Sequence, residues 1–466
     1  MPSFTPDHYP SIQVYLTVKE HQLPPAMSID RLFIRRANIL LPSGEFLLGD
    51  VQIQGGEIVQ VAQSIPASET DKEIDAQGLT LFPGVIDPQV HFREPGLEHK
   101  EDLFTASCAC AKGGVTSFLE MPNTRPLTTT QSALDDKLRR AADKCLVNYG
   151  FFIGATAQNL PDLLEANPTP GIKIFMGSMH GALLVDGESA LESIFESGDR
   201  LIAVHAEDQE RINQRRSEFA GITDVAVHSQ IQDNQAALQA TQLALHLSKK
   251  YRRRLHILHL STAVEADLLR QDKPSWVTAE VTPQHLLLNT SAYEKIGTLA
   301  QMNPPLRSPH DNEVLWQALL DGVIDFIATD HAPHTLEEKA QGYPNTPSGM
   351  PGVETSLPLM LTAAMQGRCS VAQVSHWMST AVAKAYGIPK KGAIAPGYDA
   401  DLVLVDLNAY RPVLREELLT KCGWSPFEGW NLTGWPVITI VGGKIVYERG
   451  KLNTEVRGEA LTFENS

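Results

Sequence analysis

The fold of this chain is decided by one stretch of its sequence, Phe82-Pro-Gly-Val-Ile-Asp-Pro-Gln-Val-His-Phe-Arg-Glu-Pro-Gly96. Its apolar run gives way to the polar residues Asp87, His91 and Arg93, and a Pro-Gly pair follows at once. This pattern predicts a buried strand whose carboxyl end delivers polar side chains into a cavity. The strands of a β/α barrel present their functional residues in this way.

Seven further apolar segments follow, and helical patterns separate most of them. This alternation is the signature of parallel β/α units, and eight such units close into a barrel. We therefore predict an α/β fold with a (β/α)8 TIM-type barrel over residues 81–391. The eight candidate strands are Leu79–Val85, Val115–Glu120, Val147–Ile153, Gly171–Phe175, Leu201–His205, Arg254–His259, Val277–Val281 and Asp325–Ala328.

The two ends of the chain differ from its middle. Both alternate short apolar runs with turns, as in Asp50-Val-Gln-Ile-Gln54 and Asp401-Leu-Val-Leu-Val-Asp406, which is typical of antiparallel strands. We predict that residues 28–80 and 392–455 together build one small β-sandwich domain. Residues 1–27 contain five prolines and are predicted to be an irregular N-terminal extension.

The composition excludes several classes of partner. The 466 residues carry a formal net charge of −16, which argues against a nucleic-acid or membrane partner, because both require a basic surface. No apolar run reaches the roughly 18 residues of a membrane span, and no secretory signal is evident. The five cysteines include no Cys-x-x-Cys pair, which favours a reducing cytoplasm over a disulfide framework.

Polar residues stand at the carboxyl ends of several predicted strands, where such barrels carry their chemistry. A single histidine at a strand end is more often structural than functional. His91, His205 and His259, together with Asp330, would however share one rim of the barrel. Imidazole and carboxylate groups are ligands of zinc and similar ions, so the sequence predicts a metal site.

Lys173 lies inside another strand-end stretch, Gly171-Ile-Lys-Ile-Phe-Met176. The simplest interpretation is a lysine in an ion pair. Burial beside a cation would instead lower its pKa and leave a neutral, nucleophilic amine. Such an amine can take up carbon dioxide to form a carbamate, which would bridge two metal ions as a carboxylate does.

Over roughly residues 30–450 the chain resembles the dihydroorotases of the amidohydrolase superfamily. Each matching motif is weak alone, and the shared order of the motifs makes the resemblance specific. The motifs are Val90-His-Phe-Arg-Glu-Pro-Gly96, Met121-Pro-Asn-Thr124, Gly171-Ile-Lys-Ile-Phe175, Val204-His-Ala-Glu207, Ile257-Leu-His-Leu-Ser261, Met302-Asn-Pro-Pro-Leu-Arg307, Ala328-Thr-Asp-His-Ala-Pro-His334, Ser348-Gly-Met-Pro-Gly-Val-Glu-Thr355 and Gly392-Ala-Ile-Ala-Pro-Gly-Tyr-Asp-Ala-Asp-Leu-Val403.

The resemblance implies a metal-dependent site. Asp330 matches the acid/base residue of the family, and Lys173 matches a lysine that is N6-carboxylated in many relatives. Zinc, as one or two ions per subunit, would be held by His91, Lys173, His205, His259 and Asp330.

The resemblance also implies how a substrate is held. Arg93, Asn123 and His334 match the residues that bind the substrate carboxylate. Asn303 and the loop Gly349–Gly352 match segments that touch the pyrimidine ring and cover the site.

The chain departs from the family at Gln89. Amidohydrolases usually carry His-x-His at this point, and this chain has Gln89-Val-His91. An amide oxygen is a poor zinc ligand beside an imidazole. The remaining ligands could hold two ions with one of them weakly bound, or a single ion on His205 and His259.

The leading hypothesis is a dihydroorotase, which converts (S)-dihydroorotate and water reversibly into N-carbamoyl-L-aspartate in pyrimidine biosynthesis. The resemblance implies a homo-oligomer, a dimer or a tetramer. Two alternatives stay open. Another cyclic amidohydrolase, an allantoinase or a hydantoinase, shares the barrel and the metal chemistry. A non-catalytic subunit that supports aspartate transcarbamoylase is favoured by Gln89 alone, since the other ligands remain.

Overall fold

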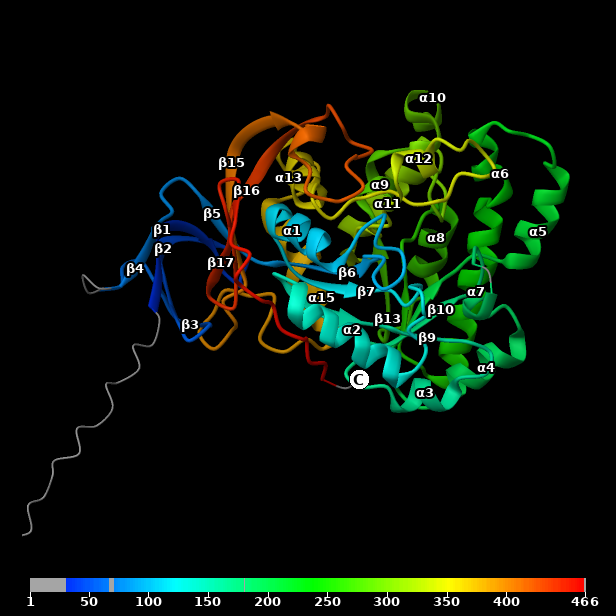
Figure 1. The fold of residues 1–466 in the computed structure, drawn as a ribbon, viewed down its shortest axis with the longest axis horizontal. Coiled ribbons are helices and arrows are strands. Elements are labelled where there is room, and N and C mark those ends of the chain that lie inside the picture. The colour runs from blue at the N-terminus through cyan, green and yellow to red at the C-terminus, as the bar shows by residue number, and fades with distance from the viewer. Residues whose placement is uncertain (1–30, 67–70, 180, 465–466) are drawn as a thin grey trace, which may run out of the picture.

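The computed structural model describes residues 31–66, 71–179 and 181–464. The N-terminal extension predicted over residues 1–27 lies outside these ranges. Figure 1 shows two bodies, a helix-covered barrel and a β-rich sheet beside it. The first and the last strands of the described chain both belong to the β-rich sheet, so the chain leaves that sheet, builds the barrel and returns.

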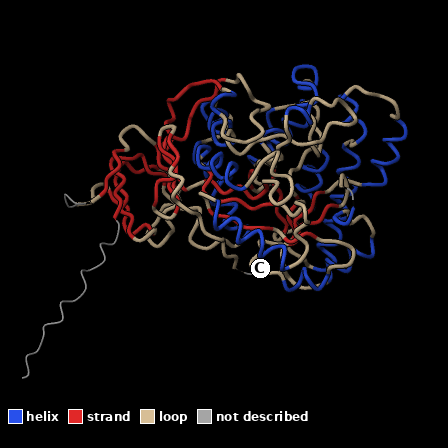
Figure 2. The backbone as a smooth tube through the Cα atoms, viewed as in Figure 1, coloured by secondary structure: helices blue, strands red, loops and turns tan. Residues whose placement is uncertain are grey.

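The barrel consists of parallel strands in two hydrogen-bonded sheets, which meet where the third barrel strand is divided at Phe152. A bridge between Val90 and His331 joins the first strand to the end of the last and closes the barrel. Figure 2 shows these strands inside a ring of helices. Nearly every strand residue is buried, which explains why each strand is an apolar run in the sequence. The strands are β6 (Val85–Val90), β7 (Val115–Glu120), β8 (Asn148–Phe151), β9 (Ile153–Gly154), β10 (Ile172–Phe175), β11 (Ile202–His205), β12 (Leu255–Ile257), β13 (Val277–Val281) and β14 (Phe326–Ile327).

The first candidate strand, Leu79–Val85, is divided in the structure. β5 (Thr80–Pro83) pairs with strands of the β-rich sheet, and the first barrel strand is β6, which begins at Val85. Gly84 lies at the crossover, where a Cβ atom would stand only 2.1 Å from Oγ1 of Thr116. The close approach of β7 therefore requires glycine between the two bodies.

The N- and C-terminal segments meet in one nine-stranded mixed sheet. β5 pairs with a strand from each end of the chain, which ties the two segments together. Ile34, Val51, Leu81, Leu402 and Ile440 belong to a core cluster that is separate from the barrel core. The strands are β1 (Arg31–Leu40), β2 (Phe46–Gln54), β3 (Glu57–Ala62), β4 (Lys72–Asp75), β5, β15 (Leu402–Pro412), β16 (Asn431–Val441), β17 (Lys444–Glu448) and β18 (Lys451–Leu452).

Local sequence sets where many of the helices begin. Asp102 with Thr105 at α1, and Thr262 with Glu265 at α8, form capping boxes. Within the described ranges, no helix is both long and apolar enough to cross a bilayer. The helices are α1 (Leu103–Gly113), α2 (Gln131–Lys144), α3 (Leu160–Glu165), α4 (Glu188–Glu196), α5 (Gln209–Glu218), α6 (His228–Ile231), α7 (Asn234–Tyr251), α8 (Ala263–Asp272), α9 (Pro283–Leu287), α10 (Ala292–Ile296), α11 (Pro309–Leu320), α12 (Leu336–Lys339), α13 (Ser356–Met365), α14 (Val371–Ser375) and α15 (Ala381–Tyr386).

Candidate active site

The carboxyl ends of the barrel strands surround a cavity of about 200 Å³. Nine of the ten site residues expected from the sequence line it, and Gly352 does not. Gly352 instead donates its backbone N–H to Nδ1 of His331, behind the cavity wall. The lining residues are Gln89, His91, Arg93, Asn123, Lys173, Phe175, Ser178, Met179, His205, His259, Asn303, Asp330, Ala332, His334, Ser348 and Gly349.

The backbone is strained around this cavity. Arg93, Ser178, His259 and Asp330 all line it, and all have a positive φ, of 69°, 57°, 37° and 47° respectively. Residues other than glycine rarely adopt this left-handed conformation, and such strain gathers at functional sites because the surrounding structure must hold it in place. The strain therefore points to the same rim of the barrel as the strand-end residues.

Two histidines face each other across the rim. His205 ends β11, His259 follows β12, and Nδ1 of the first lies 2.9 Å from Nε2 of the second. Burial lowers the pKa of His259 well below 6.5, and its neighbours His205 and Lys173 act in the same direction. His259 is therefore neutral at pH 7, which is the form that binds metal ions.

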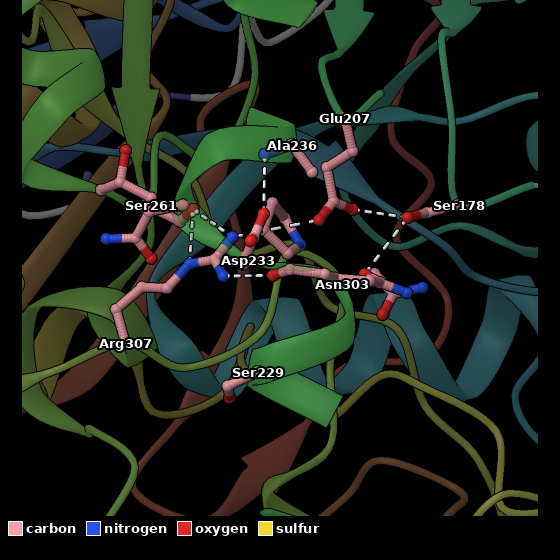
Figure 3. Close-up of polar contacts among 12 residues, drawn as sticks. Ser178, Glu207, Ser229, Asp233, Ala236, Ser261, Asn303 and Arg307 are labelled. Carbon is pink, nitrogen blue, oxygen red and sulfur yellow. Dashed lines mark hydrogen bonds and ion pairs between the residues drawn. The ribbon is translucent and has the colours of Figure 1, made fainter. Parts of the chain in front are cut away.

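A carboxylate holds the first of these rings. Oε2 of buried Glu207 accepts hydrogen bonds from Nε2 of His205 at 2.8 Å and from Oγ of Ser178 at 2.5 Å. Figure 3 shows this carboxylate with Ser178 on one side and Arg307 on the other; Nη2 of Arg307 lies 3.9 Å from Oε1. Burial raises the pKa of Glu207, but the hydrogen bonds from His205 and Ser178 and the charge of Arg307 outweigh it and lower the pKa overall. Glu207 thus keeps the proton of His205 on Nε2 and leaves Nδ1 as a free lone pair facing His259.

A second pair, His91 and Asp330, follows the first and last barrel strands. Nε2 of His91 is 3.1 Å from Oδ1 of Asp330, and Nδ1 of His91 is 2.6 Å from Oδ1 of Asn123. An amide oxygen and a carboxylate both accept, so each of these contacts calls for a ring N–H of His91, and a metal ion between Nε2 and Asp330 would leave the proton on Nδ1. Gln89 donates its side-chain N–H to the same carboxylate oxygen of Asp330 at 3.2 Å.

The residues present fit a zinc ion. Two nitrogen ligands of a tetrahedral zinc stand roughly 3.3 Å apart when each bond is 2.0–2.1 Å, and the His205–His259 and His91–Asp330 contacts are close to that separation. Nζ of Lys173 is buried without a hydrogen-bond partner, as expected of a group that requires another ligand. Among the described residues, no three His, Cys, Asp or Glu side chains stand close enough together to hold a metal ion by themselves.

One wall of the cavity holds His334, whose two ring nitrogens both have partners. Nζ of Lys100 is 3.0 Å from Nδ1 of His334, and the carbonyl oxygen of Ser348 is 3.0 Å from Nε2. A lysine only donates and a carbonyl only accepts, so the proton of His334 sits on Nε2. Burial lowers the pKa of His334 well below 6.5, and Arg93 and Lys100 reinforce the effect, so the ring is neutral.

Nη2 of Arg93 lies only 3.2 Å from this protonated Nε2 of His334. Arg93 is fixed by a hydrogen bond from its Nε to the carbonyl of Pro333 at 3.1 Å. Burial lowers the pKa of Arg93 to about 10, so it remains charged at pH 7. The charged guanidinium of Arg93, fixed beside the N–H that His334 donates to Ser348, forms a recess for an anion such as a carboxylate.

Comparison with known proteins identifies the family. The model of the amidohydrolase family matches residues 80–446. The chain belongs to the amidohydrolase family. Its curated relatives include the dihydroorotase of Methanosarcina acetivorans, 35% identical over 88% of this chain and 91% of the relative. Another is the dihydroorotase of Halobacterium salinarum, 36% identical over 86% of this chain and 93% of the relative.

Solved structures of amidohydrolases agree with the observed fold. The L-hydantoinase (dihydropyrimidinase) of Arthrobacter aurescens has a TM-score of 0.89 and 30% identity, covering 93% of this chain and 100% of the other. The dihydropyrimidinase of Brevibacillus agri has a TM-score of 0.87 and 26% identity, covering 93% of this chain and 99% of the other. The predicted fold class was a (β/α)8 barrel with a small β-sandwich domain, and it is confirmed as a barrel with a β-rich domain, whose strands form one nine-stranded mixed sheet.

Sequence reasoning missed several polar residues of this amidohydrolase site. Glu207, Ser178 and Lys100 hold the rings or line the cavity, and Arg307 supports Glu207 from behind. One signal was available for Glu207, because a carboxylate two residues after a strand-end histidine stands in Val204-His-Ala-Glu207. The other three carry no local signal, since their partners are distant in the sequence.

Proposed function

We propose that this amidohydrolase is a dihydroorotase, which hydrolyses (S)-dihydroorotate reversibly to N-carbamoyl-L-aspartate in pyrimidine biosynthesis. The dihydroorotases found as relatives cover most of the chain at about 35% identity. The observation that carries the proposal is the donor recess of Arg93 and His334 beside the strand-end ligands. Dihydroorotate has a ring amide to be opened and a carboxylate that would enter this recess.

The metal is part of the proposal. We infer that His91, Lys173, His205, His259 and Asp330 hold zinc, as one or two ions. Burial lowers the pKa of Lys173 to about 7, which supports its N6-carboxylation when two ions are present to be bridged. Bound zinc supplies Lewis-acid polarisation of the amide carbonyl and a more acidic water.

The chain's own residues orient the substrate and move the proton. Arg93 and His334 bind the substrate carboxylate and turn the ring towards the strand ends. Asp330 accepts the proton of the attacking water at its carboxylate and returns it to the leaving ring nitrogen. Gln89, 3.2 Å from Oδ1 of Asp330, holds that carboxylate in position. The small cavity, about 200 Å³, favours a compact substrate of this kind.

A substrate panel tests the proposal. Dihydroorotate should be turned over with a kcat/KM far above that for hydantoin, dihydrouracil and allantoin, because none of these rings carries a carboxylate for the recess. The hydantoinases among the solved structures make a hydantoinase the competing activity. Equal or better turnover of hydantoin or dihydrouracil would reject dihydroorotate as the substrate.

The glutamine at position 89 supports one alternative proposal, in which the protein is not an enzyme. A non-catalytic subunit that supports aspartate transcarbamoylase could lose a metal ligand without harm. Folded, zinc-loaded protein that turns over no cyclic amide, alone or mixed with aspartate transcarbamoylase, would support that role.

Assembly and location complete the proposal. We propose a homo-oligomer, a dimer or a tetramer, which size-exclusion chromatography with light scattering would test. All five cysteines are free, which supports a reducing, cytoplasmic location.

A further inference from the structure

Lys339, the last residue of α12, is a buried charge close to the active site. Its side chain is 1% exposed. Nζ donates hydrogen bonds to the backbone carbonyls of Gln301 and Pro347 at 2.9 Å and of Gly349 at 3.0 Å. An ammonium group has three N–H donors and no acceptor, so all of its donors are used and all of its partners are backbone oxygens.

These three carbonyls come from two loops that form one wall of the cavity. Ser348 and Gly349 line the cavity from one loop, and Asn303 lines it from the other, two residues after Gln301. The loops are also joined directly, since Gly349 donates its N–H to the carbonyl of Gln301 at 2.9 Å, and Nε2 of Gln301 donates to Oγ of Ser348 at 3.1 Å. Lys339 stands behind this wall and ties both of its halves.

The backbone of this wall is tightly packed against its neighbours. Gly349 has a φ of 136°, and a Cβ atom there would lie 2.5 Å from the carbonyl oxygen of Ala332. The carbonyl oxygen of Ser348 accepts the hydrogen bond from Nε2 of His334, so the position of this loop also sets the direction of a substrate donor. A shift of the loop would therefore reach the anion recess as well as the cavity wall.

An uncharged side chain could fill the same space without the free-energy cost of burying a charge. Burial lowers the pKa of Lys339 to about 7, because an ammonium group loses its hydration there. A neutral amine has only two N–H groups and would give up one of these three hydrogen bonds. The three hydrogen bonds therefore favour the charged form, and the charge in turn fixes the spacing of the two loops.

We propose that Lys339 is a positioning residue for the substrate, whose ammonium group holds the 301–303 and 347–349 loops at the spacing that the substrate ring requires. It acts through Asn303, Ser348 and Gly349 and touches no reacting atom. This inference rests on the proposed function, since dihydroorotate is the substrate used to measure it.

The test compares Lys339→Met with a matched control, Lys391→Met. Lys391 is also a largely buried lysine, but it pairs with Asp399 and Asp401 far from the cavity. We expect Lys339→Met to raise the KM for dihydroorotate at least tenfold, with kcat within about threefold and zinc content unchanged. Lys391→Met should lower the melting temperature and leave KM within twofold. A folded Lys339→Met variant with an unchanged KM, or an equal rise of KM in both variants, would overturn the proposal.

Two further measurements keep the inference testable on its own. Lys339→Arg retains the charge but spreads its donors in a plane, so it should fold and still raise KM at least threefold; an unchanged KM would count against the proposal. Hydrogen exchange of zinc-loaded protein needs no substrate. Exchange in Lys339→Met should accelerate in residues 301–303 and 347–349 more than elsewhere, and equal exchange in these loops would refute the role of Lys339. If the wild type fails to turn over dihydroorotate, the proposed function fails, and the exchange measurement alone decides the inference.

Discussion

The substitution Arg93→Lys tests whether Arg93 binds the substrate through its fixed N–H donors or only through its positive charge. The substitution keeps the charge and the backbone strain at φ 69°, since lysine meets the same restriction there as arginine. It removes the Nε bond to Pro333 that aims the side chain and the Nη2 donor beside His334. A hydrogen bond to a charged group contributes roughly 1.5–3 kcal/mol, which corresponds to a loss of about 10- to 150-fold in kcat/KM at 1.36 kcal/mol per factor of ten.

The assay is steady-state hydrolysis of dihydroorotate beside a ring that lacks the carboxylate, such as dihydrouracil. The loss should appear with dihydroorotate and be small with dihydrouracil, because only the first engages the recess. Arg368→Lys is the matched control, since Arg368 makes a two-pronged contact with Glu313 at the surface. An unchanged kcat/KM for dihydroorotate, or the same loss with both rings, would remove Arg93 from carboxylate binding.

Three further substitutions test the strand-end residues. Asp330→Asn should lower kcat by at least the roughly 10²- to 10⁴-fold of a lost general acid–base group in folded protein; activity within tenfold of the wild type would assign the proton transfer to another group. Glu207→Gln should weaken zinc binding by roughly 10- to 100-fold in a chelator competition, because the carboxylate that orients His205 loses its charge; an unchanged affinity would leave Glu207 a structural role only. Wild-type protein should hold at most one fully occupied ion by elemental analysis, and Gln89→His should raise that number or tighten the weaker ion; two full ions in the wild type would show that the substitution at Gln89 is neutral.

The sequence was a good guide wherever a residue's role depends on its own strand. The barrel strands are apolar because both of their faces are buried, and the expected ligands are visible because they stand at the carboxyl ends of those strands. The boundary at Gly84 was not predictable, since a single apolar run passes from one body into the other.

The residues that support the site were harder to find. Lys100 bonds to His334, 234 residues away, and Lys339 bonds to a carbonyl 38 residues away. In the sequence both are ordinary charged residues of polar segments, and only the folded chain brings them to the site. Gly352 was expected at the cavity and does not line it, because spacing along a loop does not say which face of the loop meets the cavity.

The bridge that closes the barrel has a consequence for how the protein is made. His91 follows the first barrel strand and donates its backbone N–H to the carbonyl of His331 at 2.7 Å, one residue beyond Asp330. The proposed acid/base residue and its histidine neighbour therefore meet across the seam of the barrel. A ribosome must release the segment that contains residue 331 before these two groups can come together. Truncated or half-made chains thus carry no assembled site. In a circular permutant whose termini lie at this seam, the two ends of the chain would have to dock together before the site could form.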